Sequence, residues 1–241
     1  MKKFSFLILP LIHMVVMAGS VLCIHRVLGV VYGGGHDFVV AMIAPIMVLF
    51  LAVSLYWRRN RHKFELRPSL GWSLLLIPGI PVALLGFVAL ARGGQSAGAF
   101  FALLLLAVGV GVVEEVIYRG VVVGAMARQF SLPAVVWGSG ALFGLAHAVN
   151  IFGGQAPSQT VQQVLSTAVS GVAYAVFYLY VRRLSPLIML HATWDFVILS
   201  RTIDDGSAWH ILLTLIPILE IIAAIVIWVK FRQRLALYDD Q

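Results

Sequence analysis

Eight long apolar runs separated by short loops constrain the fold of this chain more than any other feature. The runs cover residues 4–31, 38–57, 71–91, 97–127, 132–149, 160–181, 185–200 and 210–229. A helix needs about 20 apolar residues to cross the hydrocarbon core of a bilayer. The chain is 61% hydrophobic and 11% charged, whereas soluble domains carry about 25% charged residues. We therefore expect an all-α polytopic membrane protein with about eight transmembrane helices, forming a single domain over residues 1–241.

The basic residues predict how this bundle is oriented. One set of loops and the two chain ends collect Lys2, Lys3, Arg58, Arg59, Arg61, Lys63, Arg67, Arg128, Arg182, Arg183, Lys230, Arg232 and Arg234. The alternate loops carry Asp37, Arg92 and the segment 201–205, and the loop 150–159 is uncharged. Cytoplasmic loops are enriched in Lys and Arg, so both termini are expected in the cytoplasm. The net charge of +7 then reflects membrane topology, and no nucleic-acid partner is expected.

The fourth run contains an ionisable cluster, Glu114, Glu115 and Arg119. Each such side chain costs about 2.5–3.5 kcal/mol at bilayer depth, so the cluster must be paired or face a polar cavity. Glu115 and Arg119 are four residues apart and can form an ion pair on one helix face. Glu114 is turned by about 100° from Glu115 and is free to face a cavity. The alternative is a purely structural triad that fixes helix packing.

Two further runs carry ionisable groups at similar depth. His147 is the only ionisable residue in the fifth run, and His191 and Asp195 lie four apart in the seventh. An Asp at this spacing can orient a His ring and fix its tautomer. Each group could also be a self-satisfied structural residue. Because unpaired polar groups are costly in a membrane, we expect the three spans to share one polar cavity between the central helices.

Other polar and small residues carry weaker signals. Glu220 lies deep in the last run without a partner at helical spacing, which favours a structural or accessory role. His13 belongs to no cluster, and Cys23 is the only cysteine, so an intramolecular disulfide and a Cys-based metal site are excluded. Small residues four apart, which allow close helix contact in lipid, occur at Gly120 with Gly124 and at Gly140 with Gly144.

In order, Glu114-Glu115-x-x-x-Arg119, Phe143-x-x-x-His147 and His191-x-x-x-Asp195 resemble the motif set of the CPBP intramembrane proteases. This family includes the type II CAAX prenyl endopeptidases and bacterial proteins linked to bacteriocin self-immunity. The resemblance covers about 97–200. It implies an eight-helix glutamic endopeptidase of a bacterial cell membrane that hydrolyses a peptide bond of a membrane-associated protein or peptide.

The resemblance also implies roles for single residues. Carried over by motif, Glu114 and His147 would activate the attacking water, and no cofactor would be needed. Glu115 and Arg119 would hold the helix of the base in place. Such chemistry needs a positioned base for water and donors aimed at the developing oxyanion.

The third motif departs from the CAAX type at its last position. His191 and Asp195 would stabilise the oxyanion, but CAAX-type members typically carry Asn where this chain has Asp195. An ionised Asp would repel an oxyanion. Asp195 is therefore expected to be protonated or to serve mainly in orienting His191, and a CAAX-type specificity does not follow.

Two alternatives use the same residues. A zinc protease could take Glu114, His147 and His191 as ligands, since two His and one Glu form a known catalytic zinc set. The chain lacks a His-Glu-x-x-His motif, and Arg119 would place a cation near the metal. A non-enzymatic transporter or immunity-type protein could use the cavity as a proton relay, although no duplicated halves, which are common in transporters, are visible.

Overall fold

The computed structural model describes residues 4–66, 69–93, 96–203 and 206–236. Five residues used in the topology prediction lie outside these ranges: Lys2, Lys3, Arg67, Asp204 and Asp205. Within these ranges every regular element is a helix.

The helices follow the predicted apolar runs closely. They are α1 (Ile8–Leu28), α2 (His36–Asn60), α3 (Leu76–Arg92), α4 (Ala97–Glu114), α5 (Gly124–Met126), α6 (Leu132–Ala146), α7 (Pro157–Val181), α8 (Ser185–Ser200) and α9 (Ala208–Ala236). A π-helix, Glu115–Val123, joins α4 to α5, and a 3₁₀-helix, His147–Gly153, extends α6. Short 3₁₀ turns occur at Ser5–Leu7, Arg61–Lys63 and Ser73–Leu75.

Seven helical segments in the described part of the chain are long and apolar enough to span a membrane. The eighth apolar helix is α8, which has 16 residues and is about 24 Å long at 1.5 Å per residue. The all-α polytopic fold is thereby confirmed, and the eight predicted runs correspond to seven full-length candidates and the shorter α8.

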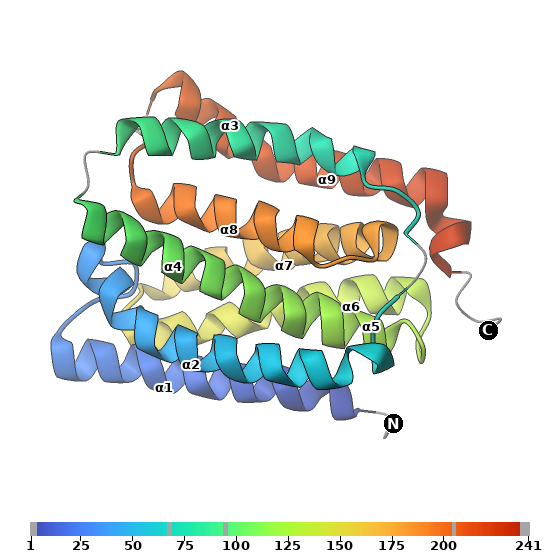
Figure 1. Cartoon of the computed structure of the whole chain (residues 1–241), viewed down its shortest axis with the longest axis horizontal. Coiled ribbons are helices and arrows are strands. Elements are labelled where there is room, and N and C mark those ends of the chain that lie inside the picture. Colours follow the sequence, from blue (N-terminus) through green and yellow to red (C-terminus); the bar gives the residue numbers. More distant parts are fainter. Residues whose placement is uncertain (1–3, 67–68, 94–95, 204–205, 237–241) are drawn as a thin grey trace.

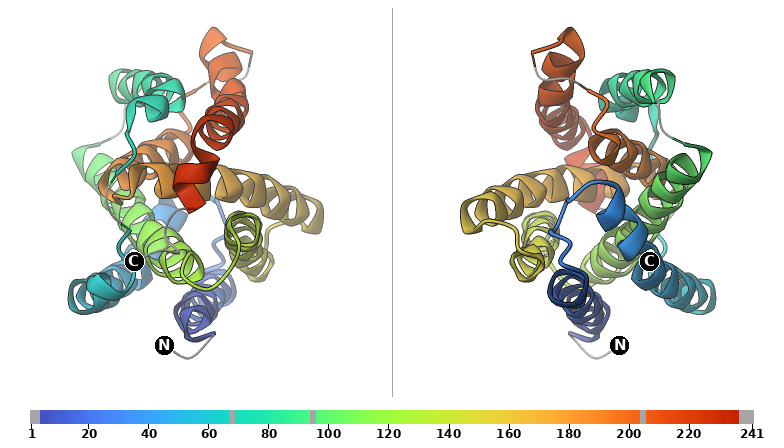
Figure 2. Two further views of the ribbon diagram at one scale, coloured as in Figure 1. Left: turned by 90° about the vertical axis from the view of Figure 1, so that its right-hand side faces the viewer. Right: turned by 90° about the vertical axis from the view of Figure 1, so that its left-hand side faces the viewer.

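The helices run side by side along the long axis of the molecule (Figure 1). Viewed down that axis, α1, α2, α3 and α9 lie on the outside of the bundle, and α6 and α7 occupy its remaining side (Figure 2). α1 begins and α9 ends at the same end of the bundle. The described helix ends with the predicted cytoplasmic basic residues, including Arg58, Arg128 and Arg182, lie at this end, which we call the basic end.

The segment from Ala97 to Met126 is one continuous helical span that changes its hydrogen-bonding pattern at the ionisable cluster. α4 ends at Glu114 and the π-helix begins at Glu115. All nine residues of the π-helix are buried. π-helical turns are rare and occur frequently at functional sites.

Glycines allow the close helix contacts that their spacing predicts. Gly140 and Gly144 of α6 face α7, and a Cβ atom on Gly144 would lie 2.6 Å from the Val164 carbonyl oxygen. Gly120 and Gly124 pack in the same way against α2 and the segment that follows it. Side chains at these positions would force the helices apart.

The basic end of the bundle is tightly packed. Large side chains there are almost completely inaccessible: Phe64, Leu66, Ile117, Tyr118, Phe177, Tyr178, Leu179 and Leu187. They come from the π-helix, the basic-end half of α7, the start of α8 and the α2–α3 connection. Protein interiors packed in this way leave few voids larger than a water molecule.

Candidate active site

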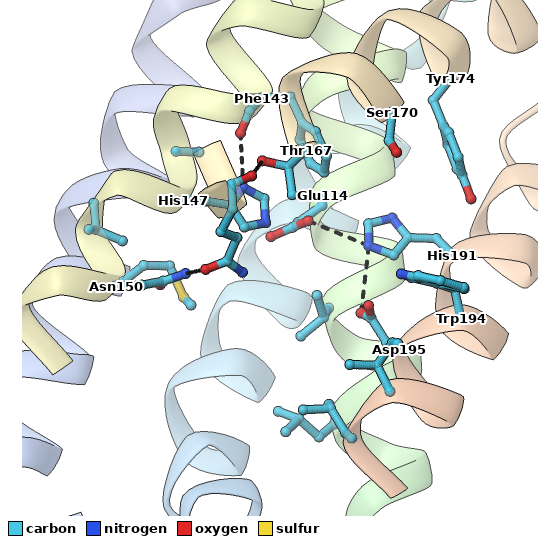
Figure 3. Close-up of a pocket in the computed structure, with 18 of the residues that line it drawn as sticks. Glu114, Phe143, His147, Asn150, Thr167, Ser170, Tyr174, His191, Trp194 and Asp195 are labelled. Atoms are coloured by element: carbon cyan, nitrogen blue, oxygen red, sulfur yellow. Dashed lines mark hydrogen bonds and ion pairs between the residues drawn. The ribbon is translucent and has the colours of Figure 1, made fainter. Parts of the chain in front are cut away.

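A single cavity of about 250 Å³ brings the three motifs together. It is lined by side chains of α1, α2, α4, the π-helix, α6 and its 3₁₀ extension, α7, α8 and α9. Glu114, His147, His191 and Asp195 all face it (Figure 3). Glu115 does not line the cavity, in agreement with the predicted difference in direction between the two adjacent glutamates.

His191 lies at the centre of the charged groups and contacts three carboxyl groups. Its Nδ1 atom is 2.7 Å from Glu115 Oε1. Its Nε2 atom is 3.6 Å from Glu114 Oε2 and 3.5 Å from Asp195 Oδ2. Because a carboxylate only accepts, the short contact indicates that Nδ1–H donates to Glu115. The ring of His191 therefore bridges α8 to both glutamates of the first motif.

The ion pair between Glu115 and Arg119 is present and fully enclosed. Arg119 Nη1 donates to Glu115 Oε1 at 3.0 Å, and the two side chains are 1% and 0% exposed. The guanidinium lies over the ring of Phe143, 4.2 Å from its centroid, and 5.0 Å from that of Tyr174. Glu115 thus neutralises Arg119 and also holds His191, a second partner that the local spacing does not show.

Asp195 differs from its expected orienting role. The sequence spacing predicts that Asp195 fixes the tautomer of His191, but Glu115 makes the hydrogen bond to Nδ1. Asp195 instead approaches Nε2 at 3.5 Å. The Nδ1 atom faces the span of Glu115, so the partner from another helix takes the short bond. Asp195 lies on the cavity side of the ring.

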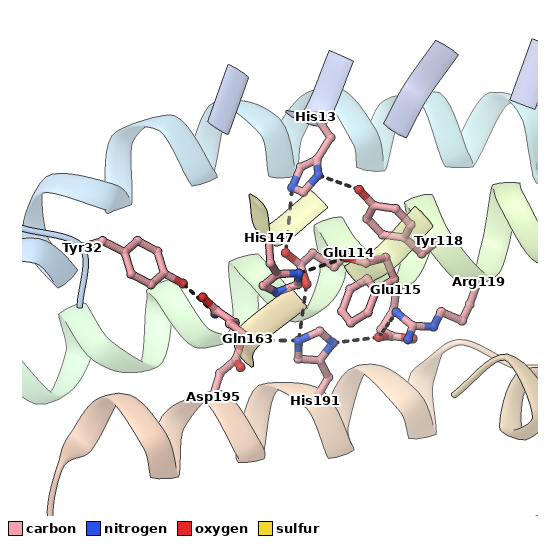
Figure 4. A network of polar contacts seen from close by, with 11 residues as sticks. His13, Tyr32, Glu114, Glu115, Tyr118, Arg119, His147, Gln163, His191 and Asp195 are labelled. Carbon is pink, nitrogen blue, oxygen red and sulfur yellow. Dashed lines mark hydrogen bonds and ion pairs between the residues drawn. The ribbon is translucent and has the colours of Figure 1, made fainter. Parts of the chain in front are cut away.

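His147 begins the 3₁₀-helix, and its position is fixed by the preceding turn. Its Nδ1 atom is 3.0 Å from the carbonyl oxygen of Phe143. A carbonyl oxygen only accepts, so Nδ1 carries the proton and, in the neutral ring, Nε2 carries the lone pair. Figures 3 and 4 both show the ring of His147 beside the carboxyl group of Glu114.

His13 is a cavity residue that the sequence patterns do not identify. It is 3% exposed, its Nε2 atom is 3.9 Å from Glu114 Oε1, and its Nδ1 atom is 3.1 Å from Tyr118 Oη (Figure 4). Nε2 has no hydrogen-bond partner among the described atoms. A lone histidine in α1 shows no local pattern, because both partners lie about a hundred residues further along the chain.

Glu220 also reaches the cavity from α9. Its Oε2 atom accepts a hydrogen bond of 3.1 Å from Ser170 Oγ on α7. Ser170 is 50 residues away in the sequence, so the helical spacing around Glu220 does not identify it as a partner. The accessory role expected for Glu220 stays a prediction.

A network of uncharged polar side chains lies on one side of the cavity near the α1–α2 loop. Gln163 Oε1 accepts from Asn150 Nδ2 at 2.9 Å and from Gln155 Nε2 at 3.0 Å. Gln163 Nε2 donates to Tyr32 Oη at 3.2 Å, and Thr160 Oγ1 donates to Gln155 Oε1 at 2.9 Å. These groups tie the α1–α2 loop to α7 and to the 3₁₀-helix, and we call them the polar wall.

The arrangement of the His, Cys, Asp and Glu side chains also bears on metal binding. Over the described ranges, no group of three or more His, Cys, Asp or Glu side chains has an arrangement that could hold a metal ion. The three ligands of the zinc alternative, Glu114, His147 and His191, line one cavity, and independence from metal stays a prediction.

The fold and the site define an integral multi-pass membrane protein with carboxyl and imidazole groups gathered inside its helix bundle. Residues 96–197 match the model of the family described as Type II CAAX prenyl endopeptidase Rce1-like. The match contains all three motifs and covers less than half of the chain, and it confirms the family resemblance that these motifs carry. No curated protein and no solved structure matches the chain.

Proposed function

We propose that this protein is an intramembrane glutamic endopeptidase that cleaves a membrane-associated protein or peptide with a water activated by Glu114 and His147. The family match supports the coarser assignment to a protease of the CAAX-endopeptidase type. The observation that carries the finer proposal is the gathering of Glu114, His147 and His191 around one cavity within the bundle.

In the proposed reaction, Glu114 is the general base. A water held between its carboxyl group and Nε2 of His147 loses a proton to Glu114 as its oxygen attacks the peptide carbonyl carbon. The same proton is then transferred to the leaving amine nitrogen as the C–N bond breaks. Proton transfer by a positioned side chain contributes about 10²–10⁴-fold to the rate of such reactions.

His191 is the proposed donor to the oxyanion. Glu115 holds the Nδ1–H of the ring at 2.7 Å, so donation from the cavity side requires the doubly protonated imidazolium with Nε2–H. A charged donor aimed at a developing oxyanion in a water-poor site stabilises the transition state more than the ground state. Asp195, 3.5 Å from Nε2, is proposed to carry a proton when substrate is bound, since an ionised carboxylate would repel the oxyanion.

The decisive experiment is a cleavage screen of membrane-anchored peptides with the wild type and Glu114→Gln. The substitution preserves size and hydrogen-bonding atoms but removes the base, so turnover should fall to background while expression and thermal stability stay near normal. Glu65→Gln, in the α2–α3 connection outside the cavity, is the control and should keep full turnover.

A different result would reassign the base. If purified Glu114→Gln retained most of its turnover while Glu115→Gln lost it, Glu115 would be the base and the pairing argument for Arg119 would fail. If both variants cleaved normally, the cavity would not be the site of hydrolysis.

A further inference from the structure

The cavity runs from the middle of the bundle toward one end only. Arg119 and His191 mark its inner part, and Tyr32, Asn150 and Gln163 mark its other part. Figure 4 shows Arg119 and Tyr32 at opposite ends of this row of polar side chains. Tyr32 belongs to the α1–α2 loop, so this part of the cavity lies at the end of the bundle opposite the basic end.

The opposite direction is blocked by packing. Beyond Glu114, the π-helix contacts α7. Ile117 and Tyr118 of the π-helix belong to the same buried core as Phe177 and Tyr178 in the basic-end half of α7. All four side chains are at most 1% exposed. A peptide coming from the basic end would have to displace this core, and opening a packed interior costs several kcal/mol.

Charge assigns the two ends to the two sides of the membrane. At the end with the polar wall, the described basic residues at helix ends are Arg26, Arg92 and Arg201. The larger group, which includes Arg58, Arg128, Arg182 and Arg232, lies at the basic end. Since Lys and Arg accumulate on the cytoplasmic side, the cavity extends toward the non-cytoplasmic side.

We propose that the substrate is a peptide segment that reaches Glu114 from the non-cytoplasmic side of the membrane, passing the polar wall. This inference rests on the proposed function, and it specifies from which side the substrate comes. The amide and hydroxyl groups of the wall, Tyr32, Asn150 and Gln163, match the uncharged donors and acceptors of a peptide backbone. A protein or peptide exposed on the outer surface of the membrane is therefore the substrate class.

The test measures accessibility and needs no turnover. In a Cys23→Ser background, which removes the only cysteine, a single cysteine is introduced at Thr167 on α7, a cavity-lining residue. Ile198→Cys, at another cavity-lining residue on α8, gives a second position. A membrane-impermeant maleimide is added to right-side-out and to inside-out vesicles, with labelling in detergent as the maximum.

Two exposed loop positions calibrate the sides. Ser131→Cys precedes α6 at the basic end, and Ala156→Cys precedes α7 at the other end. We expect Thr167→Cys and Ile198→Cys to be labelled from the same side as Ala156→Cys. We expect no labelling of these two positions from the side of Ser131→Cys. We also expect Ser131→Cys to be labelled only in inside-out vesicles.

Each other outcome overturns the inference. Labelling of the cavity from the side of Ser131→Cys would show a path through the packed end, and labelling from neither side, with full labelling in detergent, would show a closed cavity. Labelling of Ser131→Cys in right-side-out vesicles would reverse the sidedness. Failure of the proposed function would instead appear as unaltered cleavage by the Glu114→Gln variant. That result would not change the labelling patterns.

Discussion

Glu115 has two partners at one carboxyl oxygen, Arg119 at 3.0 Å and His191 at 2.7 Å. It is completely buried, so these two bonds replace the water that its charge would otherwise require. The carboxylate therefore fixes the ring of a proposed catalytic residue on α8 and at the same time neutralises a cation on its own helix. Removal of Arg119 leaves this carboxylate without its neutralising cation, and removal of His191 leaves the ion pair without its second hydrogen bond.

Replacement of Arg119 tests this arrangement. Arg119→Ala leaves Glu115 with His191 alone, and breaking a buried ion pair typically costs about 3–5 kcal/mol. We expect a clear fall in Tm and in membrane yield together with loss of cleavage. Thermal unfolding of the purified protein in detergent gives the measurement, with Arg59→Ala, at an exposed position on α2, as the control. A wild-type Tm for Arg119→Ala would mean that the pair does not stabilise the fold.

His13 is expected to act as a positioning residue through Glu114. His13→Gln can keep a bond to Tyr118 but removes the ring nitrogen 3.9 Å from the Glu114 carboxyl. We expect kcat to fall about tenfold, equivalent to about 1.4 kcal/mol of activation free energy, with KM and Tm nearly unchanged. His25→Gln, three turns along α1, is the control. A lower Tm with unchanged kcat would indicate a structural role only.

The residue-level predictions succeed where partners are local in the chain. Glu115 and Arg119 are four residues apart, and their ion pair follows from helical spacing. The bond from His191 to Glu115 spans 76 residues and that from His13 to Tyr118 spans 105. Such contacts depend on which helices pack together, and one sequence contains no periodic signal for that choice.

At the scale of elements, apolar length predicts helices well and hydrogen-bonding pattern poorly. The run 185–200 coincides with α8, and the run 97–127 with the long fourth span. Nothing in the composition distinguishes the π-helix Glu115–Val123 from the α-helix before it, because both are apolar apart from the cluster. The wider turn arises where buried side chains from several helices meet.

The contact of α6 with α7 gives a prediction at this scale. A Cβ atom at Gly144 would lie 2.6 Å from the Val164 carbonyl oxygen and 2.6 Å from Ala168 Cβ. Gly144→Val should destabilise the protein by about 1–3 kcal/mol, the usual cost of overpacking. Gly19→Val, where a Cβ would meet nothing within 4 Å, controls for helix propensity. Equal Tm values for the two variants in thermal unfolding would contradict the packing argument.

For the whole molecule, we predict a hydrolysis reaction that uses only protein side chains. Exhaustive chelation of the purified enzyme should leave the cleavage rate unchanged, and elemental analysis should find no stoichiometric zinc. The reason is that Glu114 and His147 are proposed to activate water directly. One zinc per chain, with activity restored only by added metal, would establish the zinc protease alternative.

A cavity that opens to one side only, with a packed basic end on the other, would affect how the membrane voltage falls across the protein. With the access proposed above, water that reaches Glu114 would carry the electrical potential of the non-cytoplasmic solution into the middle of the bilayer. The voltage would then drop mainly across the packed half, where Glu115 neutralises Arg119. Moving one charge through the full field is worth about 2.3 kcal/mol per 100 mV, but a proton passing between that solution and Glu114 crosses little of it. The proposed hydrolysis at this site would then be nearly independent of the membrane voltage.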